Sequence, residues 1–121
     1  MDEVSVPSAP ANEMLDRLGS AFKLLADPTR LRVFDLLMQG VQCNCEIGDA
    51  LDLSPNLISH HLGALRRAGL VDVERDPNDA RWLYYSVNRG ALRDVRESIA
   101  AFLDADRIHD RHPQCGPASQ R

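Results

Sequence analysis

Residues 47–70 read IGDALDLSPNLISHHLGALRRAGL, and this stretch decides the fold. It contains two short helical patterns that are separated by a turn at residues 53–55. The second pattern opens on Ser54, a residue type that caps helices, and on a proline at the first helical position. Two short helices joined by a tight turn predict a helix-turn-helix unit. The inward-facing positions follow from the helical spacing: Ile47, Ala50 and Leu51 in the first helix, and Ile58, Leu62 and Leu65 in the second.

The flanking segments extend this unit on both sides. Asp27-Pro28 marks the start of a helix, and the alternating residues 71–75 precede a turn-rich connection and a run of strand-forming residues. In chain order the predicted elements are a helix over 12–25, a helix over 28–40, a helix from 44 or 45 to 51, a helix over 55–69, strands over 71–75 and 82–87, and a helix over 88–108. The helix over 28–40 is expected to carry its apolar residues on one side: Leu31, Phe34, Leu37 and Met38.

This order predicts a mainly α fold with a β-hairpin wing, that is, a winged helix-turn-helix. The first and last helices carry apolar stripes that have no partner within so small a domain, so we expect a dimer through the first and last helices. The expected organisation is a flexible N-terminal tail at 1–11, a DNA-binding and dimerisation domain at 12–110, and a flexible C-terminal tail at 111–121.

The charge and the composition of the chain exclude several classes of function. The net charge of −4 argues against a general binder of polyanions. Residues 54–86 contain four arginines and four acidic residues, so the expected DNA-facing part is neutral by count. The sequence has no apolar run long enough for a membrane span and no export signal, which favours the cytoplasm. We expect no enzyme, because the sequence shows no nucleophile–base–acid set and no glycine-rich phosphate loop.

The three cysteines are Cys43, Cys45 and Cys115, an odd number that makes a poor disulfide framework. Soft ions such as As(III), Sb(III), Cd(II) and Pb(II) prefer thiolate sulfur. A thiol at a helix N-terminus is expected to have a lowered pKa. Residues two apart on a helix point about 200° apart, so both sulfurs cannot hold one ion while both residues are helical. Either the helix starts after Cys43 and leaves it free to swing, or ligation unwinds the first turn.

Trivalent arsenic favours three sulfur ligands, and Cys115 is the remaining candidate, from the same or the partner subunit. The alternative for the cysteine pair is that it is merely small and partly buried. His109 and His112 are interpreted as solvated residues at a helix end rather than as ligands.

The second helix of the helix-turn-helix is expected to lie in the major groove of DNA with its N-terminal half at the base edges. His61 is interpreted as a packed, structural histidine. Trp82, Tyr84 and Tyr85 are expected to pack rather than to stack on bases. The exposed positions nearest the bases are Pro55, Asn56, Ser59 and His60, and the candidate phosphate contacts are Arg66 and Arg67.

Three segments in this order resemble the ArsR/SmtB family of metal-sensing repressors: LLADPTRLRVFDLL at 24–37, LSPNLISHHLGALRRAGLV at 53–71 and DARWLYYSVN at 79–88. The resemblance covers residues 18–87 and implies a winged helix that represses transcription. It also implies that Arg81 enters the minor groove. The arsenic-sensing branch carries a C-x-C-x-x-C pattern, in which Cys43 and Cys45 match and the third position is Gly48. The zinc pattern of the last helix is not satisfied, because it needs Asp at Arg96 and His at Ser98.

Together these observations predict a dimeric repressor that releases its operator when As(III) or Sb(III), or else Cd(II) or Pb(II), binds Cys43 and Cys45, with Cys115 as a third ligand. One alternative keeps the fold and makes the protein a thiol-redox or reactive-sulfur sensor, in which Cys43 or Cys45 pairs with Cys115 or across the dimer. Another alternative is a metal-buffering or interaction module that does not bind DNA.

Overall fold

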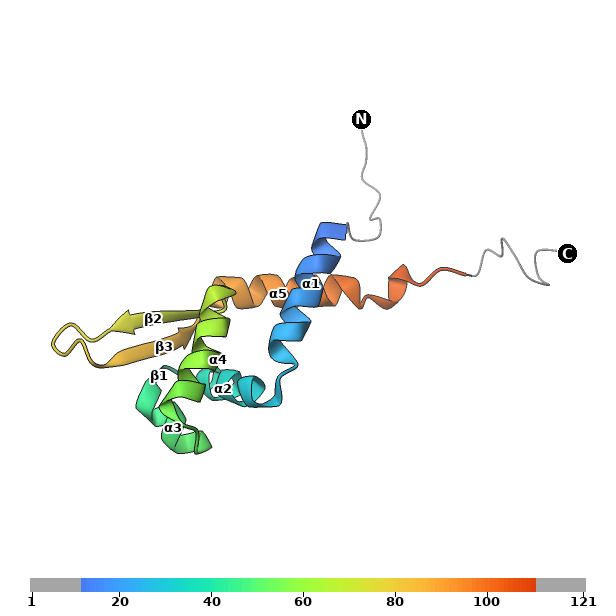
Figure 1. Cartoon of the computed structure of the whole chain (residues 1–121). Helices are drawn as coiled ribbons and strands as arrows, with labels where there is room; N and C mark the ends of the chain where they lie inside the picture. The colour runs from blue at the N-terminus through green and yellow to red at the C-terminus, as the bar shows by residue number, and fades with distance from the viewer. Residues whose placement is uncertain (1–11, 111–121) are drawn as a thin grey trace, which may run out of the picture.

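The computed structural model describes residues 12–110 and contains the predicted helices and hairpin in the predicted order (Figure 1). The predicted tails at 1–11 and 111–121, and with them Cys115, lie outside the described residues. In chain order the elements are α1 (Asn12–Leu25), α2 (Pro28–Met38), β1 (Gln42–Cys43), α3 (Asn44–Leu51), α4 (Pro55–Arg67), β2 (Val71–Arg75), β3 (Leu83–Val87), α5 (Arg89–Phe102) and the short 3₁₀ turn η1 (Ala105–Arg107).

Side-chain caps set the starts of three helices. The Asp27 carboxylate accepts the N–H of Arg30 at 3.0 Å, and the Ser54 hydroxyl accepts the N–H of Leu57 at 3.2 Å. Both caps precede a proline at the first helical position, as the sequence predicted. At α5 the side-chain oxygen of Asn88 accepts the N–H of Ala91 at 2.9 Å. Local chemistry therefore determines where α2, α4 and α5 begin.

The sheet is antiparallel with the strand order β1-β3-β2. The hairpin of β2 and β3 pairs Val71 with Val87 at its base and Arg75 with Leu83 near its tip, and it projects away from the helices (Figure 1). The two-residue strand β1 was not predicted. It pairs with β3 through Gln42↔Tyr85 and Cys43↔Tyr84, and so attaches the start of α3 to the wing.

The core lies where α2, α3 and α4 meet the base of the hairpin. Two predicted inward positions of α2 are wrong: Leu31 is 49% exposed and Met38 is 52% exposed. The buried face of α2 is centred on Val33 and Leu37, which are four residues apart, and this rotates Leu31 and Met38 toward the surface. Ala50 of α3 is likewise exposed. The core residues are Val33, Phe34, Leu37, Ile47, Ile58, Leu62, Leu65, Leu70 and Val71.

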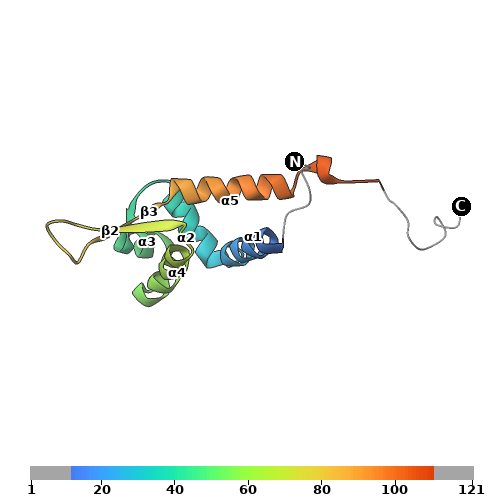
Figure 2. The same ribbon diagram turned by 90° about the horizontal axis from the view of Figure 1, so that it is seen from above.

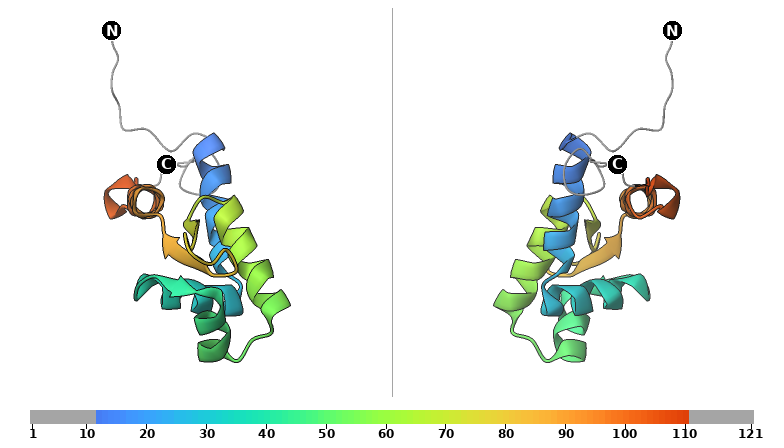
Figure 3. Two further views of the ribbon diagram at one scale, coloured as in Figure 1. Left: turned by 90° about the vertical axis from the view of Figure 1, so that its left-hand side faces the viewer. Right: turned by 90° about the vertical axis from the view of Figure 1, so that its right-hand side faces the viewer.

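Helices α1 and α5 contact each other and lie on the side of the domain away from α3 (Figures 2 and 3). No residue of α5 is buried, and Leu15 and Phe22 of α1 are 38% and 43% exposed. The last helix ends at Phe102, six residues earlier than predicted. Asp104 ends the helical path, because its carboxylate accepts the N–H of Asp106 and caps the separate turn η1.

Among residues 12–110, no helix combines the length and the apolar character that crossing a lipid bilayer requires.

Candidate functional site

The sulfur atoms of Cys43 and Cys45 lie 2.8 Å apart. Cys43 is the last residue of β1 and the N-cap of α3, with an extended backbone at φ −84° and ψ 158°. Cys45 is in the first turn of α3 and is exposed, whereas Cys43 is 4% exposed. The two sulfurs meet because only Cys45 is helical, which resolves the geometric difficulty that the spacing raised.

The carboxylate of Glu46 fixes this turn. Its Oε1 accepts the backbone N–H of Cys43 at 2.8 Å, and this hydrogen bond lowers the pKa of Glu46. The arrangement satisfies a donor that helix formation would leave unpaired at the start of α3. It also holds the backbone of Cys43 close to the first turn, so the two thiols stay within reach of each other.

The expected lowering of the thiol pKa is wrong for Cys43. Burial is the main cause that raises the pKa of Cys43 to about 11, and the hydrogen bond with Cys45 adds to it. The backbone N–H of Glu46 acts in the opposite direction but does not outweigh them. Removing the thiol from water penalises its charged form more than the helix N-terminus favours it. At neutral pH Cys43 is therefore a protonated thiol.

Cys43 is also not free to swing, as one of the two predicted possibilities required. Its backbone pairs with Tyr84 in the sheet. Any ligand that moves Cys43 must displace the β1–β3 pairing or the first turn of α3. The thiol pair is therefore mechanically connected to two elements, the helix that supports α4 and the central strand of the wing.

Within residues 12–110 no group of three or more His, Cys, Asp or Glu side chains is arranged to hold a metal ion. Gly48, at the third position of the C-x-C-x-x-C pattern, packs against the turn before α4: a Cβ atom there would lie 3.3 Å from the carbonyl oxygen of Leu53. The described residues thus offer two cysteine sulfurs at this position, and Cys115 lies outside them.

Helix α4 presents the predicted base-contacting residues at its exposed N-terminal half. His61, by contrast, is 4% exposed, and its Nδ1 has no hydrogen-bond partner among the described residues. This confirms the interpretation of His61 as a packed residue. The exposed residues of α4 include all six that the sequence singled out: Pro55, Asn56, Ser59, His60, Arg66 and Arg67.

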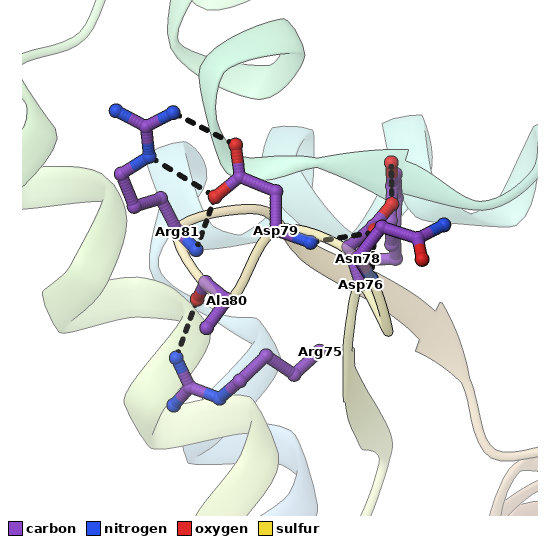
Figure 4. Close-up of polar contacts among 7 residues, drawn as sticks. Arg75, Asp76, Asn78, Asp79, Ala80 and Arg81 are labelled. Carbon is purple, nitrogen blue, oxygen red and sulfur yellow. Dashed lines mark hydrogen bonds and ion pairs between the residues drawn. The ribbon is translucent and has the colours of Figure 1, made fainter.

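Arg81 lies at the tip of the wing, where its side chain is 86% exposed and forms an ion pair with Asp79 at 2.8 Å (Figure 4). The loop itself is held by Asp76, whose Oδ1 accepts the N–H groups of Asn78 and Asp79 at 2.8 and 3.0 Å. Nearby, Arg75 donates to the carbonyl oxygen of Ala80 at 2.6 Å. The wing tip is therefore a turn closed by its own hydrogen bonds, with the Arg81 side chain exposed on it.

The sequence reasoning missed Asp76 and Tyr84 as site residues. The Tyr84 hydroxyl donates to Oδ2 of Asp76 at 3.1 Å, so it buttresses the carboxylate that shapes the wing loop. The sequence around Asp76 indicated its role, because an Asp followed by Pro-Asn-Asp favours a turn that is closed by the Asp side chain. No local signal indicated Tyr84, since its contact depends on the strand register.

Comparison with known proteins agrees with this architecture. Residues 27–73 match the family described as "Bacterial regulatory protein, arsR family". The transcriptional repressor SdpR of Bacillus subtilis is 34% identical over 87 residues, which cover 72% of this chain and 93% of that protein. The arsenic resistance transcriptional regulator ArsR1 of Pseudomonas putida is 37% identical over 86 residues, covering 70% of this chain and 65% of that protein.

A solved structure described as "Possible transcriptional regulator for arsenical resistance" is 30% identical and has a TM-score of 0.61. The similarity covers 76% of this chain and 88% of that one. The matched segment, the length of the aligned relatives and the shared winged-helix architecture agree with one another. The chain therefore belongs to the ArsR family of bacterial regulatory proteins, which are DNA-binding transcriptional regulators with a winged helix-turn-helix fold and are not enzymes.

Proposed function

We propose that this protein is a dimeric repressor that leaves its operator when As(III) or Sb(III) binds Cys43 and Cys45. The observation that carries the proposal is the 2.8 Å separation of the two sulfurs at the start of the first helix of the helix-turn-helix. Cys115 is the proposed third ligand, from either subunit. Because the target is chromosomal DNA, the proposal places the protein in the cytoplasm.

The chemistry of the donor set supports a soft ligand. Two thiols with no carboxylate or imidazole between them suit As(III) and Sb(III), and also Cd(II) and Pb(II), better than they suit hard cations. The relative ArsR1 of Pseudomonas putida is named for arsenic resistance. The absence from this chain of the family's third cysteine, at Gly48, leaves the described residues with a two-sulfur site that Cys115 or a small thiol would complete.

The sulfur separation also gives a reason for coupling. Sulfurs that share one ion through bonds of about 2.3 Å lie about 3.3–3.8 Å apart, from the pyramidal angles of As(III) and Sb(III) to the angle of a tetrahedral ion. The pair must therefore open by about 0.5–1 Å relative to its present 2.8 Å. Cys43 is held in β1 and Cys45 in α3, so opening the pair disturbs the first turn of α3, the helix on which α4 packs.

On DNA, α4 would lie in the major groove and Arg81 of the wing in the minor groove. Asn56, Ser59 and His60 would contact base edges, with Pro55 beside them, while Arg66 and Arg67 would contact phosphates. Residues 12–110 would form the DNA-binding and dimerisation domain. The partner's α1 and α5 would cover the apolar surface that these helices expose, which includes Leu15 and Phe22.

The test is fluorescence anisotropy of a labelled operator fragment bound to the full-length protein. We expect arsenite and antimonite to release wild-type protein. Reversing occupancy from 99:1 to 1:99 requires the ligand to prefer the released form by about 5.5 kcal/mol. Cys43→Ser and Cys45→Ser should bind DNA normally and fail to respond, and Cys115→Ser should respond in part. The proposed site would be refuted if the arsenite concentration that releases the wild-type protein from DNA also released all three variants.

The exposure of Cys45 favours one alternative, a thiol-redox repressor. A peroxide would accept two electrons and two protons from two thiols, leaving a disulfide and water. A ring formed by Cys43 and Cys45 directly is strained at this spacing, so the expected pairing is with Cys115 or across the dimer. Peroxide treatment followed by mass measurement without reductant separates the two functions: a loss of two hydrogens together with reductant-reversible release from DNA supports the redox function.

A further inference from the structure

Tyr84 borders both the start of α3, where the two thiols lie, and the loop at the tip of the wing. It lies on the central strand β3, where its register partners are Cys43 on β1 and Glu74 on β2. Its hydroxyl donates to Asp76 at 3.1 Å. The hydrogen bond to Asp76 is the main cause that raises the pKa of Tyr84. Through its backbone pairing with Cys43 and its hydroxyl contact with Asp76, Tyr84 therefore connects the start of α3 to the wing loop.

From Asp76 a continuous series of hydrogen bonds leads to the wing arginine. The Oδ1 atom of Asp76 accepts the backbone N–H of Asp79 at 3.0 Å. The carboxylate of Asp79 in turn accepts the Nε–H of Arg81 at 3.0 Å and an Nη2–H at 2.8 Å (Figure 4). These hydrogen bonds connect the Tyr84 hydroxyl to the Arg81 guanidinium through Asp76 and Asp79.

We propose that Tyr84 is the positioning residue through which ligand binding at Cys43 and Cys45 displaces Arg81 from DNA. The inference rests on the function proposed above and adds a second route of regulation, through the wing, to the route through α3 and α4. Tyr84 touches neither the ligand nor DNA in this scheme.

The weakness of the β1–β3 pairing makes such a displacement attainable. Only two residue pairs join β1 to β3, whereas five join β2 to β3. A ligand that draws Cys43 away from its present position therefore strains the shorter pairing first. Because Tyr84 is the register partner of Cys43, this strain acts at the residue that holds Asp76.

The experiment compares Tyr84→Phe with Tyr85→Phe, which removes the same oxygen atom from the adjacent residue. Successive residues of a strand point to opposite faces, and Tyr85 packs against the core. For each protein, operator affinity is measured with and without arsenite, and arsenite affinity is measured without DNA. The ratio of the two operator affinities gives the coupling. We expect Tyr84→Phe to reduce the coupling ratio about five- to tenfold, as expected for the removal of one ordinary, partly solvent-exposed hydrogen bond.

Arsenite affinity of the free protein should stay within about twofold in both variants, and Tyr85→Phe should keep the wild-type coupling ratio. Asp76→Asn should reduce the ratio as Tyr84→Phe does. In an Arg81→Ala background, Tyr84→Phe should cause no further reduction, since the terminal residue of the series is already gone. If Tyr84 had a merely structural role, Tyr84→Phe would lower operator affinity equally with and without arsenite, and the coupling ratio would not change.

Two results overturn the inference in distinguishable ways. If wild-type protein responds to arsenite and Tyr84→Phe keeps the full coupling ratio, the route through the wing is wrong while the thiol site stands. If arsenite fails to release the wild-type protein at all, the proposed function fails, and the role of Tyr84 fails with it.

Discussion

Asp79 binds the guanidinium of Arg81 at two points, with Oδ1 accepting from Nε at 3.0 Å and Oδ2 from Nη2 at 2.8 Å. The side chain that is predicted to approach DNA is thus oriented, and its charge is balanced, by a residue two positions before it. A phosphate that approaches Arg81 meets this carboxylate as well. Asp79 therefore sets the direction in which the wing arginine points and offsets its positive charge.

We expect Asp79→Asn to raise the affinity for nonspecific DNA about two- to fivefold, because a carboxylate that competes with phosphate for an exposed arginine is removed. Arg81→Ala should weaken binding and reduce the slope of log affinity against log salt by about 0.9 for each phosphate that the arginine neutralises. Salt titrations of anisotropy with a scrambled duplex measure both effects. Weaker binding by Asp79→Asn would indicate that orientation matters more than charge.

Asn56 and Arg67 lie at opposite ends of α4, and we expect their substitution to affect DNA binding in different ways. Asn56→Ala removes a side chain suited to adenine, so we expect a loss of about 1–3 kcal/mol for the operator and little change for scrambled DNA. Arg67→Ala removes a phosphate-binding side chain and should weaken both duplexes alike. Competition between the two duplexes gives the specificity ratio for each variant. If Asn56→Ala leaves that ratio unchanged, α4 does not read the bases in the orientation proposed.

The raised pKa of Cys43, about 11, predicts that the affinity for Cd(II) depends on pH and that the affinity for arsenous acid hardly does. Cd(II) must displace the thiol proton, so its affinity should rise about tenfold per pH unit between about pH 6.5 and 8.5 for each proton released. Arsenous acid, As(OH)₃, loses one hydroxide for each thiol proton and forms water, so its affinity should stay nearly flat over the same range.

Calorimetry in two buffers of different ionisation enthalpy counts the protons released and provides the measurement. Cadmium should release at least one proton per site at pH 7, and arsenite none. Cys43→Ser should remove the proton that Cys43 contributes. Cadmium binding that releases no proton at neutral pH would show that the thiol is already ionised, contrary to the effect of burial.

The parts of this fold that the sequence predicted well are those that a few adjacent residues determine. Asp27-Pro28 and Ser54-Pro55 each combine a capping side chain with a proline that cannot donate, so the starts of α2 and α4 follow from local chemistry. His61 was correctly interpreted as packed because it lies three residues after Ile58 on the helix, next to Leu62.

What the sequence could not predict depends on contacts between distant residues. Strand β1 has two residues and exists because residues some 40 positions later lie beside it. The same pairing buries Cys43 and reverses the expected direction of its pKa shift. The role of Tyr84 likewise depends on the register of β3, which no spacing along the chain reveals. The candidate DNA-contacting residues were predictable as exposed, since helical periodicity alone separates them from the core.

Because His61 is buried, we expect the protein to lose stability in acid. Burial lowers its pKa, the charges of Arg30 and His60 lower it further, and the carboxylate of Asp27 opposes them. A histidine with a lowered folded-state pKa is protonated first in the unfolded chain. Folding stability is therefore fully present above the unfolded pKa, near 6.5, and is lost as the pH falls from there toward the folded pKa.

We expect the urea midpoint of unfolding to fall between pH 7.5 and 5.5 at fixed protein concentration, and His61→Leu to flatten this dependence. At pH 7.5 the same variant should be no less stable than wild type, because it removes a buried nitrogen that has no hydrogen-bond partner among the described residues. The control is His60→Gln, which changes the exposed residue next to His61. This variant should still lose most of the stability that the wild type loses between pH 7.5 and 5.5. An unaltered pH profile of His61→Leu between pH 7.5 and 5.5 would refute the assignment to His61, because the carboxylate cap Asp27, whose pKa is lowered, loses its contribution only at more acidic pH.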